Sequence, residues 1–268
     1  MSFLDPLTQL EALAALALIS IISLRYHLLD REGVLASIPI GYVIFTLGGI
    51  EYFVMLLLFF GLSSIATKIR VRKIGANFLE KDWVRSWRNV FANGFVPASI
   101  IVFGYVCRTL CSSLVAIGYL AALGTAFADT LATEIGLLYP KKPRLITNLK
   151  EVIRGTPGAI SPYGYAGGFL ASLIVCAFSY GLGITNPFSF PIIIIASILG
   201  MTIDSVLGAT IQAKYRCRIC GKLTEKPHHC GQQSEKITGI KIINTHVVNL
   251  ISTGAGGGIA VIIVSLIF

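Results

Sequence analysis

Two acidic residues, Asp129 and Glu134, lie inside an apolar segment that runs from residue 112 to 139. A carboxylate at bilayer depth costs about 2.5–3.5 kcal/mol on insertion scales, so such residues usually face a polar cavity and mark a functional site. A third acid, Asp204, lies in a similar segment, and each aspartate precedes the next polar stretch by ten residues. Ten helical residues span about 15 Å, so we expect both aspartates at comparable depth.

The three acids together suit a magnesium ion. Asp129 and Glu134 lie about 140° apart around a regular helix, so one helix cannot direct both at a single ion, and we expect Asp204 to lie between them. Mg²⁺ binds through one or two carboxylates and completes its shell with water and substrate phosphate. We therefore predict Asp129, Glu134 and Asp204 as magnesium ligands and catalytic residues. The alternative is that these acids are buried and only hydrogen-bonded to neighbours.

The loop from residue 140 to 161 carries cationic residues before a turn rich in glycine and hydroxyl side chains, and this turn opens a helix. Backbone N–H groups and the dipole at a helix N-terminus favour a phosphate. The pattern is not a Walker loop, and a plain turn between helices is the alternative. The predicted phosphate-binding residues of this loop are Arg144, Lys150, Arg154, Gly155, Thr156, Gly158 and Ser161.

Three asparagines near the starts of apolar segments, Asn89, Asn93 and Asn249, are predicted as further substrate contacts. Asparagine is costly within a membrane span unless its amide is hydrogen-bonded. Helix capping and bonding between helices are the alternative roles for each of them.

A separate metal site is predicted in the polar loop 213–241. Cys217 and Cys220 form a Cys-x-x-Cys pair, and His228, His229 and Cys230 follow in the same loop. Three thiolates and an imidazole suit a tetrahedral, structural zinc site. We predict Cys217, Cys220, His229 and Cys230 as the ligands, with His228 as the alternative imidazole and a metal-free or redox pair as the alternative chemistry.

The composition indicates the elements that position these residues. Hydrophobic residues make up 54% of the 268-residue chain, charged residues 13%, and the mean hydropathy is +0.77. These values are typical of an all-α integral membrane protein, here one polytopic domain over residues 1–268. Asp129-Thr130 and Asp204-Ser205 also hint at a weak internal repeat of 75 residues. Apolar runs predict about eight spans, near 7–26, 33–49, 50–66, 90–107, 112–139, 162–183, 189–212 and 247–267.

The charges predict how the chain is oriented. With eight spans, every basic residue except Arg108 falls on one side of the membrane, which the positive-inside rule makes cytosolic, with both termini outside. The net charge of +9 also suits an anionic ligand or anionic lipid. Aromatic residues do not interleave with the basic ones, so no nucleic acid is expected. The chain shows neither a cleavable secretory signal nor a transit segment, which favours a prokaryotic cell membrane; the oligomeric state is left open.

Several of these motifs together resemble a known family. They are Gly124-Thr125-x-x-Ala128-Asp129-Thr130-x-Ala132-Thr133-Glu134-x-Gly136, Pro143-Arg144-x-Ile146-Thr147, Gly155-Thr156-x-Gly158-x-x-Ser161, Asp204-Ser205-x-x-Gly208-Ala209-x-x-Gln212, and Cys217-x-x-Cys220 before His229-Cys230-Gly231. From about Asp30 to the C-terminus the chain resembles the polytopic membrane family catalogued as domain of unknown function number ninety-two, which includes the plant phytyl-phosphate kinases. The resemblance implies transfer of a phosphoryl group from a nucleoside triphosphate, CTP, to an isoprenyl monophosphate, giving the diphosphate.

Two other functions fit the same residues. An ion-coupled transporter also has intramembrane acids and internal repeats, but places its acids at the bilayer centre with access from both sides. A cytidylyltransferase acting on a lipid phosphate uses the same metal and CTP but releases pyrophosphate. The enzyme interpretation requires the acids to lie near the cytosolic surface.

Overall fold

The computed structural model describes residues 5–75, 84–107 and 112–267. Over these residues the chain forms a bundle of long helices, which confirms the expected all-α integral membrane architecture. Lys81 and Arg108, both counted in the charge analysis, lie outside the described residues. The α-helices are α1 (Pro6–Arg25), α2 (Arg31–Val43), α3 (Ile50–Ile74), α4 (Trp87–Val106), α5 (Ser112–Gly136), α6 (Pro162–Gly181), α7 (Phe190–Thr210) and α8 (Thr245–Ile267).

Seven of the described helices are long and apolar enough to cross a membrane, and α2 is the exception with 13 residues. It continues without a break into a π-helix, η1 (Ile44–Gly48), and Gly49, at a φ of 101°, then starts the turn into α3. Residues 31–48 together reach roughly 27 Å at the α-helical rise, close to the hydrocarbon thickness of a bilayer. A helix of two types therefore occupies the place of the predicted second span, although it is not among the seven helices that are long and apolar enough by themselves.

Helix α5 is the centre of the bundle. It packs against α3, α4, α6, α7 and α8, and its residues from Ala116 to Ala128 are buried without interruption. The contacts depend on small residues, as is common between membrane helices. Thr125 of α5 is fully buried, and a Cβ on Gly200 of α7 or Gly256 of α8 would overlap its side chain. Glycine at these two positions lets the three helices approach closely.

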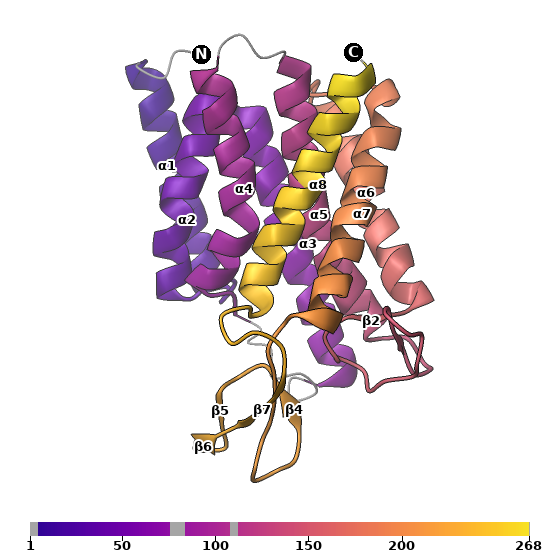
Figure 1. Cartoon of the computed structure of the whole chain (residues 1–268). Helices are drawn as coiled ribbons and strands as arrows, with labels where there is room; N and C mark the ends of the chain where they lie inside the picture. The colour runs from indigo at the N-terminus through magenta and orange to yellow at the C-terminus, as the bar shows by residue number, and fades with distance from the viewer. Residues whose placement is uncertain (1–4, 76–83, 108–111, 268) are drawn as a thin grey trace.

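Short strands occur in the two long loops at one end of the bundle. Strands β1 (Arg144–Leu145) and β2 (Ala159–Ile160) pair antiparallel within the loop between α5 and α6. The loop between α7 and α8 forms a small ribbon that projects from the bundle (Figure 1). Its strands are β3 (Lys214–Arg216), β4 (Leu223–Thr224), β5 (His228–His229), β6 (Gln232–Gln233) and β7 (Glu235–Thr238), with β4-β3-β7 in one sheet and β5-β6 in another. Strands of two to four residues are too short for an alternating pattern to be recognised in the sequence.

The two aspartates lie at comparable depth, as expected. Asp129 precedes the end of α5 by seven residues and Asp204 precedes the end of α7 by six, or roughly 9–11 Å of helix. Both helices end at the loops that contain β1 to β7, whereas α1 begins and α8 ends at the opposite end of the bundle (Figure 1). The predicted phosphate loop and the ribbon therefore share one end with both acids, which we call the loop end.

We expect the loop end to face the cytosol, because the basic loops lie there. An epitope inserted between Thr147 and Asn148, both exposed, should be cleaved by added protease only in inside-out vesicles. One inserted between Asn186 and Pro187, in the opposite loop, should be cleaved only in right-side-out vesicles. Cleavage of both epitopes from the same side would contradict the predicted orientation.

Candidate functional site

A cavity of about 130 Å³ lies at the loop end, between α5, α6, α7 and α8. Asp129 of α5 and Asp204 of α7, which are 75 residues apart in the chain, both line it. The wall also contains residues whose side chains or backbone could contact a phosphate or a metal ion. They are Arg154, Gly155, Thr156, Gly158, Ser161, Asn249 and Glu225. The structure thus brings two predicted acids together with most of the predicted phosphate turn.

The glycine turn is held in place by helix α7. Gly155 and Gly158 have φ values of 84° and 80°, a region that glycine adopts without steric cost. A Cβ on Gly158 would lie 2.5 Å from the backbone nitrogen of Ala209, so only glycine lets the turn rest on the helix. The backbone N–H of Ile146 also donates to the carbonyl oxygen of Gly158 at 3.0 Å. The turn is therefore fixed against the helix that carries Asp204.

The cations of the loop are divided between the cavity and the solvent. Arg154 lines the cavity, and its Nη2 donates to the carbonyl oxygen of Pro140 at 2.7 Å, which anchors the guanidinium at the wall. Arg144, in β1, and Lys150 are exposed and are not among the lining residues. Ser161 is the N-cap of α6 and accepts a 3.1 Å hydrogen bond from the N–H of Gly164, so its hydroxyl starts the helix as well as lining the cavity.

Helix α8 supplies another part of the wall. The hydroxyl of Ser252, only 1% exposed, donates to Oδ2 of Asp204 at 2.8 Å and holds that carboxylate. Asn249, one turn earlier in α8, lines the cavity as predicted from the sequence. Ser252 was not predicted as a site residue, because a serine in an apolar helix resembles the small residues used for packing.

The ribbon contributes a third acid to the cavity. Glu225 follows β4 directly and is partly buried at the cavity wall. No pattern in the sequence singles it out, since it stands in a polar loop next to Lys226. Only the fold of the loop between α7 and α8 brings this carboxylate to the same cavity as Asp129 and Asp204.

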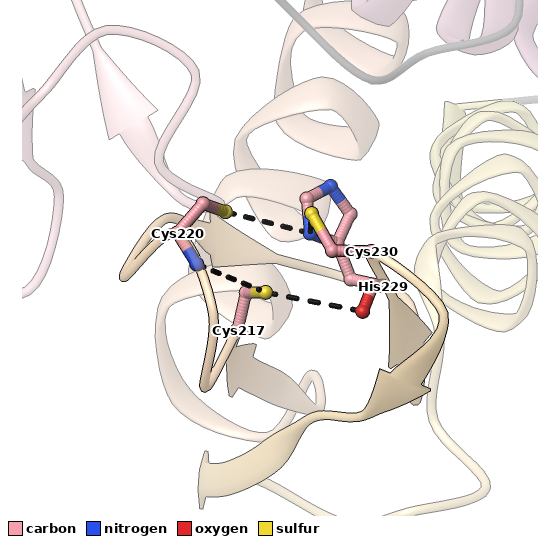
Figure 2. Close-up of side chains that lie close together, drawn as sticks. All are labelled: Cys217, Cys220, His229 and Cys230. Carbon is pink, nitrogen blue, oxygen red and sulfur yellow. Dashed lines mark hydrogen bonds between the residues drawn. The ribbon is translucent and has the colours of Figure 1, made fainter.

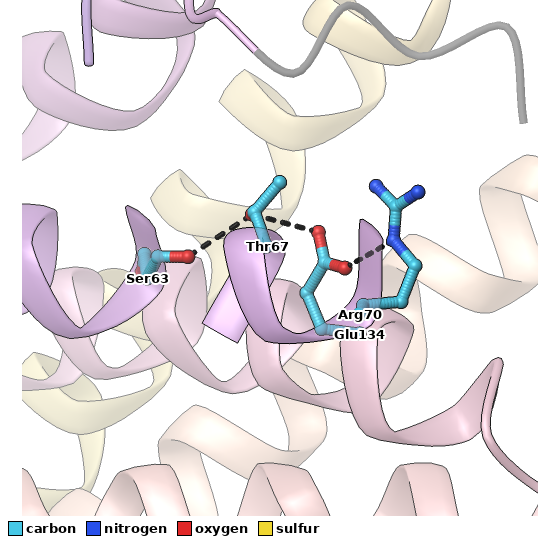
Figure 3. A network of polar contacts seen from close by, with 4 residues as sticks. All are labelled: Ser63, Thr67, Arg70 and Glu134. Atoms are coloured by element: carbon cyan, nitrogen blue, oxygen red, sulfur yellow. Dashed lines mark hydrogen bonds and ion pairs between the residues drawn. The ribbon is translucent and has the colours of Figure 1, made fainter. Parts of the chain in front are cut away.

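Glu134 is placed differently from the prediction, which grouped it with the two aspartates around one metal ion. It is not among the residues that line the cavity, and it faces α3 instead (Figure 3). Its Oε2 accepts from Nε of Arg70 at 2.8 Å, in an ion pair whose side chains are only 9% and 2% exposed. The hydroxyl of Thr67 lies 2.9 Å from Oε1 and 3.0 Å from the carbonyl oxygen of Ser63. Glu134 therefore joins α5 to α3, and its buried charge is compensated by the cation of Arg70.

The three asparagines predicted to contact substrate lie at two different cavities. Asn89 and Asn93 line a second cavity, formed by the first four helices, and neither is among the residues lining the first. Asn89 accepts from the backbone N–H of Ser86 at 3.2 Å, which is part of the capping box of α4. The predicted role in phosphate binding therefore receives geometric support only for Asn249.

Four residues of the ribbon form the group predicted to bind zinc. One ligand atom from each of Cys217, Cys220, His229 and Cys230 lies within 4.8 Å of the other three (Figure 2). Nδ1 of His229 is 3.5 Å from Sγ of Cys220 and 3.2 Å from Sγ of Cys230. Ligands at zinc-bond lengths around a tetrahedral centre are separated by about 3.5–3.8 Å. The group therefore has nearly the spacing that a zinc ion requires, and His229 rather than His228 belongs to it.

The two thiols whose pKa is shifted differ: the backbone favours the thiolate of Cys217, whereas burial, followed by the neighbouring thiols, raises the pKa of Cys230 to about 11. The N–H of Cys220 and the N–H of Ile219 donate to Sγ of Cys217 at 3.5 and 3.4 Å. The hydrogen bond from Cys220, followed by that of the His229 side chain, lowers the pKa of Cys217 to about 6. Because metals bind the thiolate form, this environment suits a metal ligand.

The family model described as Integral membrane protein DUF92 matches residues 14–257. The chain belongs to this family. An uncharacterized membrane protein of Methanocaldococcus jannaschii is 31% identical over 242 residues, which cover 88% of this chain and 85% of that protein. Protein PGR of Arabidopsis thaliana is 28% identical over 261 residues, covering 88% and 89% of the two chains. The chloroplastic protein VTE6 of the same plant is 27% identical over 239 residues, 87% of this chain and 65% of VTE6. No solved structure matches the chain.

The ion pair between Arg70 and Glu134 predicts a large loss of stability when one partner is removed. Arg70→Ala should lower the free energy of unfolding by about 3–5 kcal/mol, because it leaves a buried carboxylate without its cation. Arg72→Ala, on the exposed side of the same helix, is the control and should have little effect. Thermal unfolding in detergent compares the two; equal stability of both variants would contradict a structural role for the pair.

The Cys/His group predicts one zinc ion per chain of this DUF92 protein. Elemental analysis of the purified protein should find stoichiometric zinc, and Cys217→Ser or Cys220→Ser should lose it because the remaining ligands no longer close the tetrahedron. Cys107→Ser, at the end of α4, should retain the metal. Absence of zinc from the unaltered protein would end this hypothesis.

Proposed function

We propose that this protein transfers a phosphoryl group from a nucleoside triphosphate, with CTP as the first candidate, to an isoprenyl monophosphate. The observation that carries the proposal is the loop-end cavity, where Asp129 and Asp204 face the glycine turn and Arg154. Membership in a family that includes the plant phytyl-phosphate kinases supports the same chemistry.

The donor set of the cavity fits Mg²⁺. Asp129, Asp204 and Glu225 offer carboxylate oxygens, and no thiol or imidazole is among the described lining residues. Mg²⁺ prefers oxygen ligands and usually keeps positions for water and substrate phosphates. When bound, the ion neutralises charge on the phosphates during transfer. In this proposal Glu225 replaces Glu134 as the third acid, since Glu134 is paired with Arg70.

The remaining polar residues suit the phosphates of the two substrates. Arg154 supplies a fixed cation, and the turn at Gly155–Gly158 places backbone next to α7 and the start of α6. A guanidinium and a helix N-terminus both stabilise negative charge on phosphate oxygens. We assign these groups, with Thr156, Ser161 and Asn249, to phosphate binding, and the exposed Arg144 and Lys150 to attraction of the nucleotide from solution.

The reaction balances without a further reactant. An oxygen of the acceptor phosphate forms a bond to the γ-phosphorus of the triphosphate, while the bond from that phosphorus to the β–γ bridging oxygen breaks. The products are the isoprenyl diphosphate and the nucleoside diphosphate. The acceptor oxygen is already ionised, so the step needs positioning and charge neutralisation rather than a general base.

The position of the cavity supports an enzyme over a carrier. Two loops, the ends of α5 and α7 and the starts of α6 and α8 form its wall, so it lies at the loop end of the bundle. A carrier requires its acids near the bilayer centre, where both sides have access in turn. A cavity at one end suits a lipid substrate whose tail remains among the helices while its phosphate meets a nucleotide from the aqueous side.

The assay uses purified protein, Mg²⁺, radiolabelled CTP and geranylgeranyl phosphate, and we expect CDP and geranylgeranyl diphosphate. Asp129→Asn and Asp204→Asn should each lower kcat by at least about 100-fold, as loss of an electrostatic contact in a transition state does. Glu51→Gln, an exposed acid at the start of α3, should keep the rate of the unaltered protein. Release of pyrophosphate would instead indicate a cytidylyltransferase, and no product with any nucleoside triphosphate would contradict the proposal.

The same assay tests the acid contributed by the ribbon. Glu225→Gln should reduce turnover, whereas Glu235→Gln, on the exposed strand β7 of the same ribbon, should not. Equal rates for the two variants would remove Glu225 from the site while leaving the roles of the aspartates unchanged.

A further inference from the structure

A second cavity, of about 80 Å³, lies among α1, α2, α3 and α4. It shares no lining residue with the first cavity, within the part of the chain that the structure describes. The proposed phosphoryl transfer therefore does not account for it.

The wall of this cavity changes from apolar to polar along the bundle. Leu16 of α1 and Phe53 of α3 line its apolar part, whereas Ser23 lies seven residues nearer the end of α1, roughly 10 Å further toward the loop end. Asn93, in the second turn of α4, and Arg85, just before that helix, line the same polar part. Apolar Leu29 and Phe59 also line the cavity beside Arg85, so its polar groups are few but gather toward the loop end, an arrangement that matches an amphiphilic ligand.

Two buried polar atoms in this wall have no hydrogen-bond partner among the described residues. They are Oγ of Ser23, whose residue is 1% exposed, and Oδ1 of Asn93, whose residue is 6% exposed. Buried polar groups in folded proteins are nearly always paired, because desolvation without a hydrogen bond is costly. The carbonyl oxygen of an asparagine accepts hydrogen bonds only, so a ligand that satisfies Asn93 must carry a donor.

Arg85 supplies a positive charge at the polar end. Its backbone N–H donates to the carbonyl of Leu28 at 3.2 Å, and its carbonyl accepts from Asp30 at 3.1 Å, which joins this segment to the start of α2. The guanidinium carbon lies 5.8 Å from the centre of the Phe59 ring. Burial lowers the pKa of Arg85 to about 10, while the nearby carboxylate of Glu134, itself paired with Arg70, opposes that shift, so the group stays charged at neutral pH. The cation is therefore held where the head group of an anionic lipid would lie.

We propose that this cavity binds a membrane phospholipid whose head group carries a phosphate and a free hydroxyl, of the phosphatidylglycerol type. The phosphate pairs with Arg85, a head-group hydroxyl donates to Oδ1 of Asn93, and the hydroxyl of Ser23 completes the contacts. One hydrocarbon chain extends along Leu16 and Phe53. The site is a lipid-binding site separate from the proposed active site.

The test is native mass spectrometry of the full-length protein in detergent, titrated separately with three lipids. Phosphatidylglycerol should be retained as one molecule per chain. Phosphatidylmethanol, which is anionic but has no hydroxyl, should bind roughly 2- to 10-fold more weakly, the range expected for one hydrogen bond. Phosphatidylcholine, which has no net charge, should bind most weakly.

Matched variants locate the lipid on the protein. Arg85→Gln should weaken retention of phosphatidylglycerol by at least about tenfold, the effect of losing a charge-assisted hydrogen bond, whereas Arg88→Gln, exposed in the first turn of α4, should not. Ser23→Ala should weaken it several-fold without loss of folding, because that hydroxyl has no partner among the described residues. Ser99→Ala, on the exposed side of α4, is its control.

Three results would overturn the proposal. They are equal retention of phosphatidylcholine and phosphatidylglycerol, equal effects of Arg85→Gln and Arg88→Gln, and displacement of phosphatidylglycerol by geranylgeranyl phosphate in a manner that depends on Arg85. The last would make the cavity part of the substrate site. Because the readout is bound lipid rather than turnover, failure here leaves the proposed phosphoryl transfer untouched.

Discussion

A carboxylate inside a membrane must be paired, hydrogen-bonded or hydrated, and this constraint organises the interior of the bundle. Glu134 meets it through Arg70, in an ion pair that joins α5 to α3 on one side of the central helix. Asp204 meets it through Ser252 of α8 and through its position on a polar cavity. The two solutions have different consequences, since a carboxylate neutralised by a buried arginine is a structural group, whereas one that faces a cavity remains available to a ligand.

Two of the loops between helices contribute residues to this cavity. The loop between α5 and α6 brings Arg154 and the glycine turn to its rim, and the ribbon after α7 brings Glu225. The Cys/His group stands in the same ribbon, where the turns after Cys220 and Cys230 contain Gly221 and Gly231 at φ values of 70° and 76°. A metal at that group would give a ribbon of very short strands a fixed shape, as structural zinc does in other small folds.

The sequence predicts how far along its helix a residue lies far better than it predicts the direction in which the side chain points around that helix. Asp129, Asp204 and the glycine turn were found because the cost of a buried acid and the alternation of spans and loops locate residues along the membrane normal. Glu134, Asn89 and Asn93 also lie toward the loop end of their helices, but their side chains do not face the first cavity. The packing of the helices determines which way they face, and the sequence does not show that packing. Arg70 was counted as part of the cytosolic charge, although it is 2% exposed and paired. His228 and His229 are adjacent in a strand, where successive side chains point to opposite faces, so only one of them can join the cysteines.

The contact between Gly158 and α7 has a consequence for the kinetics of binding. Backbone rests on backbone there, with no side chain whose rotamers would have to be frozen when a ligand arrives. The turn and Asp204 therefore take up their relative positions when the protein folds. The entropy lost in ordering them does not reduce the free energy of binding a ligand. In the proposed reaction, a nucleotide that binds to this surface would lose mainly its own freedom of motion. Such a site favours fast binding, and the rate of the proposed transfer would depend on an alignment that exists before either substrate is present.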